Sequence, residues 1–101
     1  MPLRLEIESG KIDGLEDVHD LVAELPGLPI WFGRNLDALS ELAYFVKEPL
    51  DIVLINSSAL ERRLGRRDYK ALMSTLEDIR DSPNDDPNWQ PVTLTLTPLR
   101  R

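Results

Sequence analysis

The sequence predicts a two-layer α/β domain with a three-stranded parallel sheet and about four helices. The hydrophobic pattern alternates between the strand period and the helix period, in the order strand, two helices, strand, two helices, strand. Helices between successive strands act as crossover connections, which make those strands parallel. Residues 50–55 are apolar except for Asp51, which is typical of a central strand covered on both sides. A chain of 101 residues has the usual size of one domain, so we expect a single domain over residues 1–101.

The first strand, helix and loop follow from the spacing of apolar residues and from turn residues. Apolar and charged residues alternate over residues 3–8, which predicts a half-buried strand. Residues 15–25 place apolar side chains at helical spacing, with Asp13-Gly14 before them and Pro26-Gly27 after them. Residues 26–33 contain two prolines, two glycines and two large aromatic residues, so we expect a stiff loop.

The remaining elements are predicted in the same way. Asn35 is a good helix cap, and the helix that it begins runs to about Val46, with Pro49 just beyond the end. Its apolar side is formed by Leu36, Leu39, Leu42, Ala43 and Val46. The later predicted elements are the central strand 50–55, a short helix to about Leu64, a longer helix 68–80, a loop 81–88 and a last strand 92–97. Threonines alternate along the last strand, which favours a sheet edge.

Composition limits the classes of function. Eighteen acidic against twelve basic residues give a net charge of -6, which disfavours direct binding of nucleic acid or anionic membranes and favours a cationic partner. The chain has no cysteine, so disulfides, thiolate metal sites and cysteine nucleophiles are excluded. Charges interrupt every apolar run near the N-terminus, so we expect neither a secretory signal nor a spanning helix, and a cytoplasmic location. Residues 61–70 form one basic stretch, which is interpreted as a solvated helix junction.

The helix predicted over residues 35–46 has an acidic face. Asp37 and Glu41 are one helical turn apart, and like charges at this spacing destabilise a helix by roughly 0.2–0.5 kcal/mol. A cationic partner would offset that repulsion. Two plainer explanations are open, because Asp37 lies near the positive end of the helix dipole and Glu41 can be a solvated surface residue. The aromatic loop before the helix adds the composition of a rigid interface, although Trp31 and Phe32 can also be anchors on the core.

Residues 28–39 carry a recognisable pattern. They are Leu-Pro-Ile-Trp-Phe-Gly-Arg-Asn-Leu-Asp-Ala-Leu. This run is similar to the signature of the barstar family, which has Leu-Pro, two aromatic residues, Gly, and Asn-Leu-Asp-Ala-Leu. Upstream, Asp17-Val18-His19 matches the family's Asp-Leu-His at unchanged spacing. The order of the predicted elements agrees with the family along nearly the whole chain, and the resemblance is strongest over about residues 3–56.

The resemblance implies a barstar-like fold and an inhibitor of a small microbial ribonuclease. It implies that Asp37 and Glu41 enter the cationic site of the nuclease, with Trp31, Gly33 and Asn35 beside them. Tyr44, on the same helix face, and Asp78, on the fourth predicted helix, complete the predicted contact residues. The partner implied is a basic extracellular-type ribonuclease, bound one-to-one by a monomer.

Three positions depart from the family pattern. A well-known member of the family has aspartate in place of Glu41, tryptophan in place of Ser40 and an acidic residue in place of Arg34. The positive charge of Arg34 among acids would weaken binding to a barnase-like enzyme and suit a nuclease with a nearby acid. The target nuclease can therefore differ from barnase.

Two other functions are weighed against the inhibitor. The first is a regulatory interaction module of the same fold that binds a different basic protein. The second is an enzyme that uses Asp37 and Glu41 as a carboxylate pair, but an exposed pair on one helix face lacks the buried pocket that separates two pKa values. The sequence contains no nucleotide-binding loop, nucleophile motif or metal-ligand spacing, so we expect no catalytic residues, no cofactor and no metal site.

Overall fold

A computed structural model describes residues 3–81 and 86–97, and these form an α/β fold on a three-stranded sheet. The strands are β1 (Leu3–Glu8), β2 (Leu50–Ile55) and β3 (Val92–Thr97), in the spatial order β1-β2-β3. Both strand pairs are parallel, with Leu3 opposite Leu50 and Leu50 opposite Val92. The predicted fold class, the three strands and the central position of residues 50–55 are confirmed.

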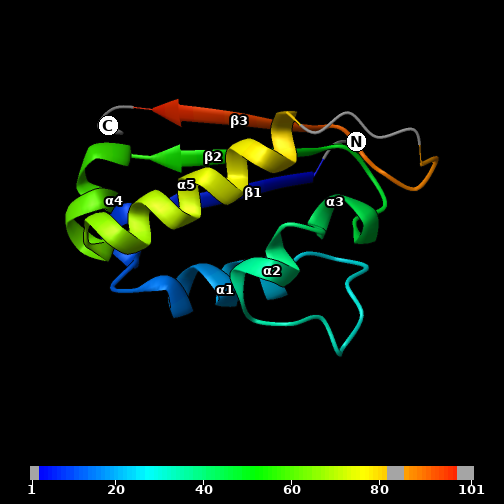
Figure 1. Cartoon of the computed structure of the whole chain (residues 1–101), viewed down its shortest axis with the longest axis horizontal. Coiled ribbons are helices and arrows are strands. Elements are labelled where there is room, and N and C mark those ends of the chain that lie inside the picture. Colours follow the sequence, from blue (N-terminus) through cyan, green and yellow to red (C-terminus); the bar gives the residue numbers. More distant parts are fainter. Residues whose placement is uncertain (1–2, 82–85, 98–101) are drawn as a thin grey trace.

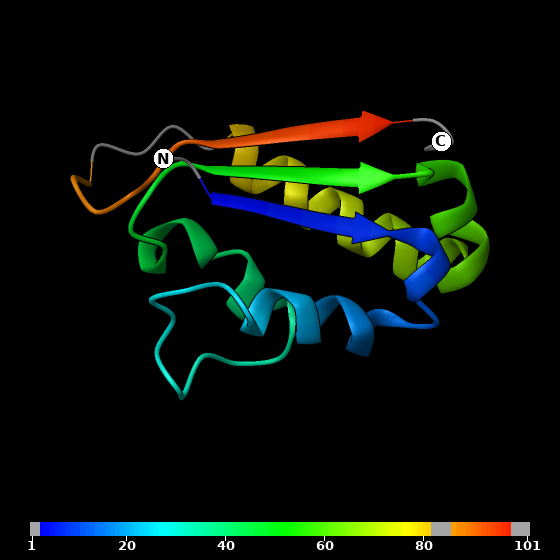
Figure 2. The same cartoon turned by 180° about the vertical axis from the view of Figure 1, so that it is seen from behind.

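The helices cover one face of this sheet. In Figure 1 helix α5 (Arg66–Asp81) lies in front of the strands, and from behind, in Figure 2, the strands lie in front of α5. Helix α1 (Leu15–Ala23) packs against β1, and α2 (Leu36–Leu39) packs against α5. The alternation of side chains along each strand points one apolar set toward this helical layer and the other set away from it.

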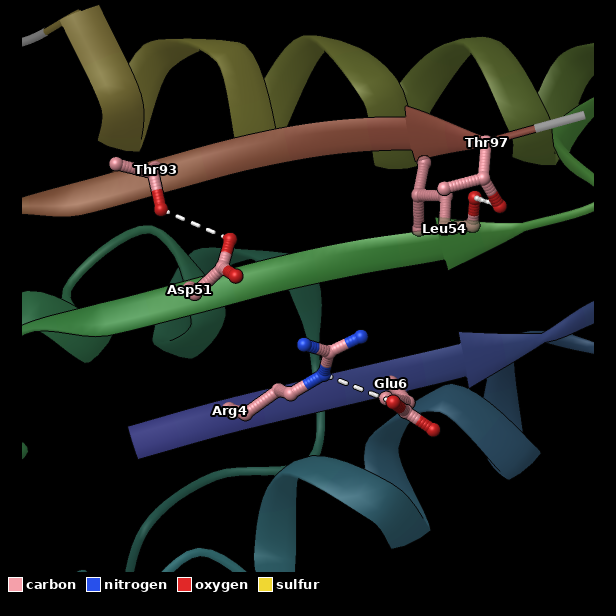
Figure 3. Close-up of polar contacts among 6 residues, drawn as sticks. All are labelled: Arg4, Glu6, Asp51, Leu54, Thr93 and Thr97. Atoms are coloured by element: carbon pink, nitrogen blue, oxygen red, sulfur yellow. Dashed lines mark hydrogen bonds and ion pairs between the residues drawn. The ribbon is translucent and has the colours of Figure 1, made fainter. Parts of the chain in front are cut away.

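The outer face of the sheet carries mostly polar side chains, and none of the described helices covers it. Figure 3 shows Arg4 paired with Glu6, at 2.8 Å between Nε and Oε2, and the hydroxyl of Thr93 donating to the Asp51 carboxylate at 2.9 Å. At the end of β3, the Thr97 hydroxyl donates to the Leu54 carbonyl at 3.3 Å (Figure 3). These contacts provide hydrogen-bond partners for polar groups on the face of the sheet that is exposed to water.

Strand β2 is buried on both sides, as expected, except at Asp51, although the described helices lie on one side of it. Val53 and Ile55 are each 3% exposed, but they point to the outer face and do not belong to the main core cluster. In register, Val53 lies between Glu6 of β1 and Thr95 of β3. The neighbouring side chains of the same face therefore bury these two residues, and no second helical layer is needed.

Helix α1 begins as predicted and ends two residues early. Its N-terminus follows Gly14, and the Asp17 carboxylate accepts a hydrogen bond from the Asp13 backbone N–H at 2.8 Å. At the other end, the N–H groups of Glu24 and Leu25 donate to carbonyls three residues back, at 3.2 and 3.1 Å. This tighter last turn still buries Leu25, so the apolar stripe extends past the regular helix. A short 3-10 turn, η1 (Ser9–Lys11), connects β1 to this region.

The prediction of a single helix over residues 35–46 is wrong, because the structure has two short helices there, α2 and α3 (Leu42–Phe45). The Ser40 hydroxyl donates to the Asp37 carbonyl at 2.6 Å. In a continuous helix that carbonyl would accept from the Glu41 N–H, which instead donates to the Ala38 carbonyl at 3.0 Å. The helix therefore breaks at Ser40 and Glu41, and the described residues contain five α-helices where about four were expected.

The remaining helices agree closely with the sequence. Helix α4 (Ser57–Leu64) ends at Gly65, whose φ of 85° is the left-handed conformation that favours glycine. Helix α5 then begins at Arg66, two residues earlier than predicted. Part of the predicted loop 81–88, including Asp85, lies outside the described residues.

One cluster of buried aliphatic residues joins the sheet to the helices. Its members with at most 1% exposure are Ile7, Ile12, Val18, Leu39, Leu42, Ala43, Val46, Ile52, Leu54, Leu60, Leu72 and Leu76. Of the side chains expected to face inward at residues 36, 39, 42, 43 and 46, the last four are among them, and Leu36 is partly buried against the cluster. Breaking the helix therefore does not change which side faces the core. No helix in the described ranges 3–81 and 86–97 is long and apolar enough to cross a membrane.

Candidate functional site

The aromatic loop between α1 and α2 is held against α3. The Phe32 N–H donates to the Pro29 carbonyl at 3.0 Å, which closes a reverse turn with Ile30 and Trp31 at its two central positions. The rings of Trp31 and Phe32 both contact Phe45 of α3 edge-on, with ring centroids 5.5 Å apart in each pair. Phe32 is half-buried and anchors the loop, whereas Trp31 remains 69% exposed. The stiff loop expected from the sequence is therefore present, and its two aromatic residues differ in exposure.

Gly33 and Asn35 connect this loop to the start of α2. The Asn35 side chain accepts a hydrogen bond from the Ala38 N–H at 2.8 Å, so it caps the helix as predicted. A Cβ at Gly33 would lie 3.0 Å from the Asn35 amide nitrogen and 3.1 Å from the Ala38 Cβ. Any side chain at position 33 would push against the cap, so Gly33 permits a close approach of the loop to α2.

Asp37 and Glu41 lie on the acidic segment, defined here as residues 35–46. Asp37 is in the first turn of α2, where the helix dipole favours a negative charge, and Glu41 is the residue that precedes α3. Both side chains are exposed, and neither carboxylate has an ion-pair partner within the described part of the chain. Two exposed carboxylates on a braced segment can accept charge-assisted hydrogen bonds from arginine, lysine or histidine groups of another molecule.

Arg34 is paired with an acid outside the acidic segment. Its guanidinium forms an ion pair with the Asp20 carboxylate of α1, and this hydrogen bond raises the pKa of Arg34. The positive charge that the sequence placed among the acids is thus matched by a residue fourteen positions earlier. Asp37 and Glu41 keep their negative charge available at the surface.

Tyr44 packs against a residue that the sequence did not single out. Its ring contacts the Trp89 ring edge-on, with centroids 4.7 Å apart. The next residue of that loop, Gln90, donates its N–H to the Ala43 carbonyl at 3.0 Å, so the chain before β3 is attached to α3. The only sequence signal for this contact was a large aromatic residue in an otherwise polar, proline-containing loop.

Asp78 reaches the surface from a different helix. It is exposed on α5, the helix against which α2 packs. Six of the seven predicted contact residues, all but Asp78, come from one continuous stretch, residues 31–44, that the ring contacts and the cap hold together. The described residues contain no group of three or more His, Asp or Glu side chains that could hold a metal ion.

Comparison with protein families adds the observation that decides the identity of the fold. The family model described as Barstar (barnase inhibitor) matches residues 3–94, nearly the whole chain. The chain belongs to the Barstar family. A comparison with curated protein sequences found no match. The family match extends well beyond the stretch 3–56, where the sequence resemblance is strongest, and it includes every predicted contact residue.

The description of the family is that of an inhibitor, and the two acids Asp37 and Glu41 lie exposed on the surface of this chain. A cleft of about 300 Å³ lies between α1 and the aromatic loop. His19 lines it, and burial lowers the pKa of His19, with the charge of Arg34 acting in the same direction and Glu16 and Asp20 opposing. The acids Asp37 and Glu41 do not line this cleft.

Proposed function

We propose that this protein inhibits a small basic microbial ribonuclease by placing the acidic segment in the cationic active site of the nuclease. One observation carries the proposal: in a chain of the Barstar family, Asp37 and Glu41 are exposed and form no ion pair with any described residue, on a segment braced by the Asn35 cap and the Phe45 ring contacts. Such carboxylates meet the arginine, lysine and histidine groups that otherwise hold RNA phosphates.

The other predicted contacts surround these two acids. Trp31, Gly33 and Asn35 precede them on the same stretch, and Tyr44 follows them. Asp78 adds an acid from α5. The proposed complex contains one nuclease molecule and one copy of this protein, which is a monomer with a single domain. The inhibitor acts in the cytoplasm, where the nuclease would otherwise cleave the RNA of the cell that produces it.

The test is inhibition of RNA cleavage. The purified protein is mixed with barnase and with several other small guanyl-preferring ribonucleases, at about 0.01 M and at about 0.15 M salt. We expect inhibition at low salt that weakens at higher salt, because the screening length falls from about 30 Å to about 8 Å. Inhibition of none of these enzymes would contradict the proposal and favour the alternative, an interaction module for a different basic protein.

Matched variants connect the inhibition to the acidic segment. Asp37→Asn and Glu41→Gln remove charge at nearly constant shape, and each should weaken inhibition and reduce its salt dependence. Glu61→Gln is the control, because it removes one exposed charge from α4, outside the acidic segment. Equal losses in all three variants would show that only net charge matters and would reject Asp37 and Glu41 as the contact residues.

A further inference from the structure

Two large apolar side chains stand in solvent at the tip of the aromatic loop. Ile30 is 103% exposed and Trp31 is 69% exposed. Within the described residues, the only other exposed large hydrophobic residue is Leu96, at 47%, on β3. Isolated exposed apolar residues are normal on protein surfaces, but two adjacent ones on an ordered turn form a small apolar patch. We call Ile30 and Trp31 the apolar tip.

The backbone of the apolar tip is fixed. The hydrogen bond from the Phe32 N–H to the Pro29 carbonyl closes the turn, and the proline restricts its own φ. Phe32 and Trp31 brace the turn against Phe45. Neither Ile30 nor Trp31 has a positive φ, so the turn accepts most residue types and its geometry does not require an isoleucine. Ile30 adds no burial to the fold that would explain its presence.

The apolar tip is continuous with the acidic segment. The Trp31 ring contacts Phe45, inside that segment, and Gly33 packs against Asn35 and Ala38 at its start. Figures 1 and 2 show the loop projecting from α2 on the side away from the sheet. A partner that covers the acidic segment would therefore also meet the apolar tip at the border of the contact.

We propose that Ile30 is a specificity-determining contact that enters an apolar pocket bordering the cationic active site of the target ribonuclease, with Trp31 beside it. This inference rests on the proposed function and adds to it the chemistry of the partner surface. Because the turn is already ordered, binding Ile30 loses little conformational entropy. A nuclease with the same cationic site and no such pocket binds more weakly, so Ile30 selects among ribonucleases that the acids alone would not distinguish.

The two parts of the surface have different kinetic signatures. Exposed charges act at long range, so Asp37 and Glu41 set the association rate and its salt dependence. Burial of Ile30 acts only after contact and is not screened by salt, so it sets the dissociation rate. Loss of apolar burial also makes the heat-capacity change of binding less negative.

The experiment uses the ribonuclease that the wild-type protein inhibits most strongly in the panel containing barnase. Ile30→Ser should weaken binding about tenfold or more, through faster dissociation, with an unchanged salt dependence of association. Ile30→Leu keeps an apolar side chain of equal size and should restore most of the affinity. Leu96→Ser is the control, because it removes the other exposed large apolar side chain, and it should bind like the wild type. Ile30 makes no core contacts, so thermal unfolding of Ile30→Ser should match the wild type.

Each outcome decides between the possibilities. Wild-type inhibition that Ile30→Ser leaves unchanged would overturn this inference and leave the proposed function intact. Absence of wild-type inhibition across the panel would overturn both. Equal losses in Ile30→Ser and Leu96→Ser would show a general effect of surface hydrophobicity and overturn the specific pocket. Sedimentation that shows a wild-type dimer, dissociated by Ile30→Ser, would assign the apolar tip to a second copy of this chain and also overturn the inference.

Discussion

Helix α5 and the acidic segment are both amphipathic, but the contacts that hold them differ in part. α5 runs unbroken over 16 residues and buries Leu72, Leu76 and Ile79 along one side. α2 and α3 have four residues each, which is too short for a helix to persist through its own hydrogen bonds. The acidic segment buries Leu39, Leu42, Ala43 and Val46 in the same core, and it depends in addition on the cap at its start and on the ring contacts of Phe45. Core packing thus stabilises both regions, and in the acidic segment the cap and the contacts with the loop fix the backbone where the helices are short.

This difference explains how the molecule presents charge. An uninterrupted helix would place Asp37 and Glu41 one regular turn apart on a single face. The break at Ser40 leaves Asp37 in the first turn of α2 and Glu41 just before the start of α3. Nearby, Asp20 is paired with Arg34, whereas Asp37 and Glu41 have no ion pair within the described residues. Because α2 and α3 are too short to depend on intrinsic helix stability, the exposed side chains of the acidic segment can be selected for contact with a partner.

The largest expected effect separates the two regions by stability. Leu76 is 1% exposed, so Leu76→Ala should lower the free energy of unfolding by about 2–5 kcal/mol, measured in urea. The affinity of the remaining folded protein for its partner should not change. Ser74→Ala is the control on the exposed side of α5 and should stay within about 0.5 kcal/mol of the wild type. A loss below about 1 kcal/mol for Leu76→Ala would show that α5 does not depend on core packing.

The sequence predicted what periodicity determines. The predicted ends agree with the observed ends to within about two residues for the three strands and for α1, α4 and α5, because each of these elements has a regular apolar spacing. The break in residues 35–46 was missed, since Leu39, Leu42 and Val46 are buried whether or not the helix is continuous. It depends on one hydroxyl-to-carbonyl hydrogen bond from Ser40, which leaves no trace in the hydrophobic pattern.

The candidate site was predicted through resemblance more than through physical pattern. The family signature in residues 28–39 named Trp31, Gly33, Asn35 and Asp37, whereas charge and spacing alone gave only an acidic face. Two features needed the fold: the Arg34 pair with Asp20 and the Trp89 contact with Tyr44. Both join residues far apart in the chain, and composition does not specify such tertiary contacts.

A smaller effect tests whether the cap holds the acidic segment. Asn35→Ala removes the hydrogen bond to the Ala38 N–H and should destabilise the fold by about 0.5–2 kcal/mol. Asn35→Ser preserves a capping oxygen and should recover most of this loss. Amide hydrogen exchange should show faster exchange in α2 than in α5 for Asn35→Ala. An equal increase of the exchange rates in α2 and α5 would mean that the two helices unfold together, and the cap would then not stabilise the acidic segment separately from α5.

The smallest expected effect concerns pH and the cleft beneath the aromatic loop. Burial and the charge of Arg34 lower the pKa of His19 from its ordinary 6.5, and Glu16 and Asp20 oppose the change. The unfolded chain therefore binds a proton more readily than the folded one. Stability contributed by neutral His19 is complete above pH 6.5 and decreases as the pH falls from there through the folded pKa. The free energy of unfolding should rise between pH 5.5 and pH 7.5, by less than the Asn35→Ala effect.

His19→Gln is the variant that isolates this contribution, because glutamine keeps polar groups in the cleft and does not titrate. Urea unfolding of His19→Gln at pH 5.5, 6.5 and 7.5 should give a flatter dependence than the wild type. Asp81 is a carboxylate whose pKa is lowered from 3.8 by its hydrogen bond to Arg80, so its contribution to the free energy of unfolding is lost only below this pH window. Tyr69, whose burial raises its pKa from 10.0, titrates above the window. An equal dependence of the free energy of unfolding on pH in both proteins would contradict this prediction. Protonation of His19 would then not affect stability, and packing and the Arg34 ion pair would be the contacts by which α1 supports the aromatic loop.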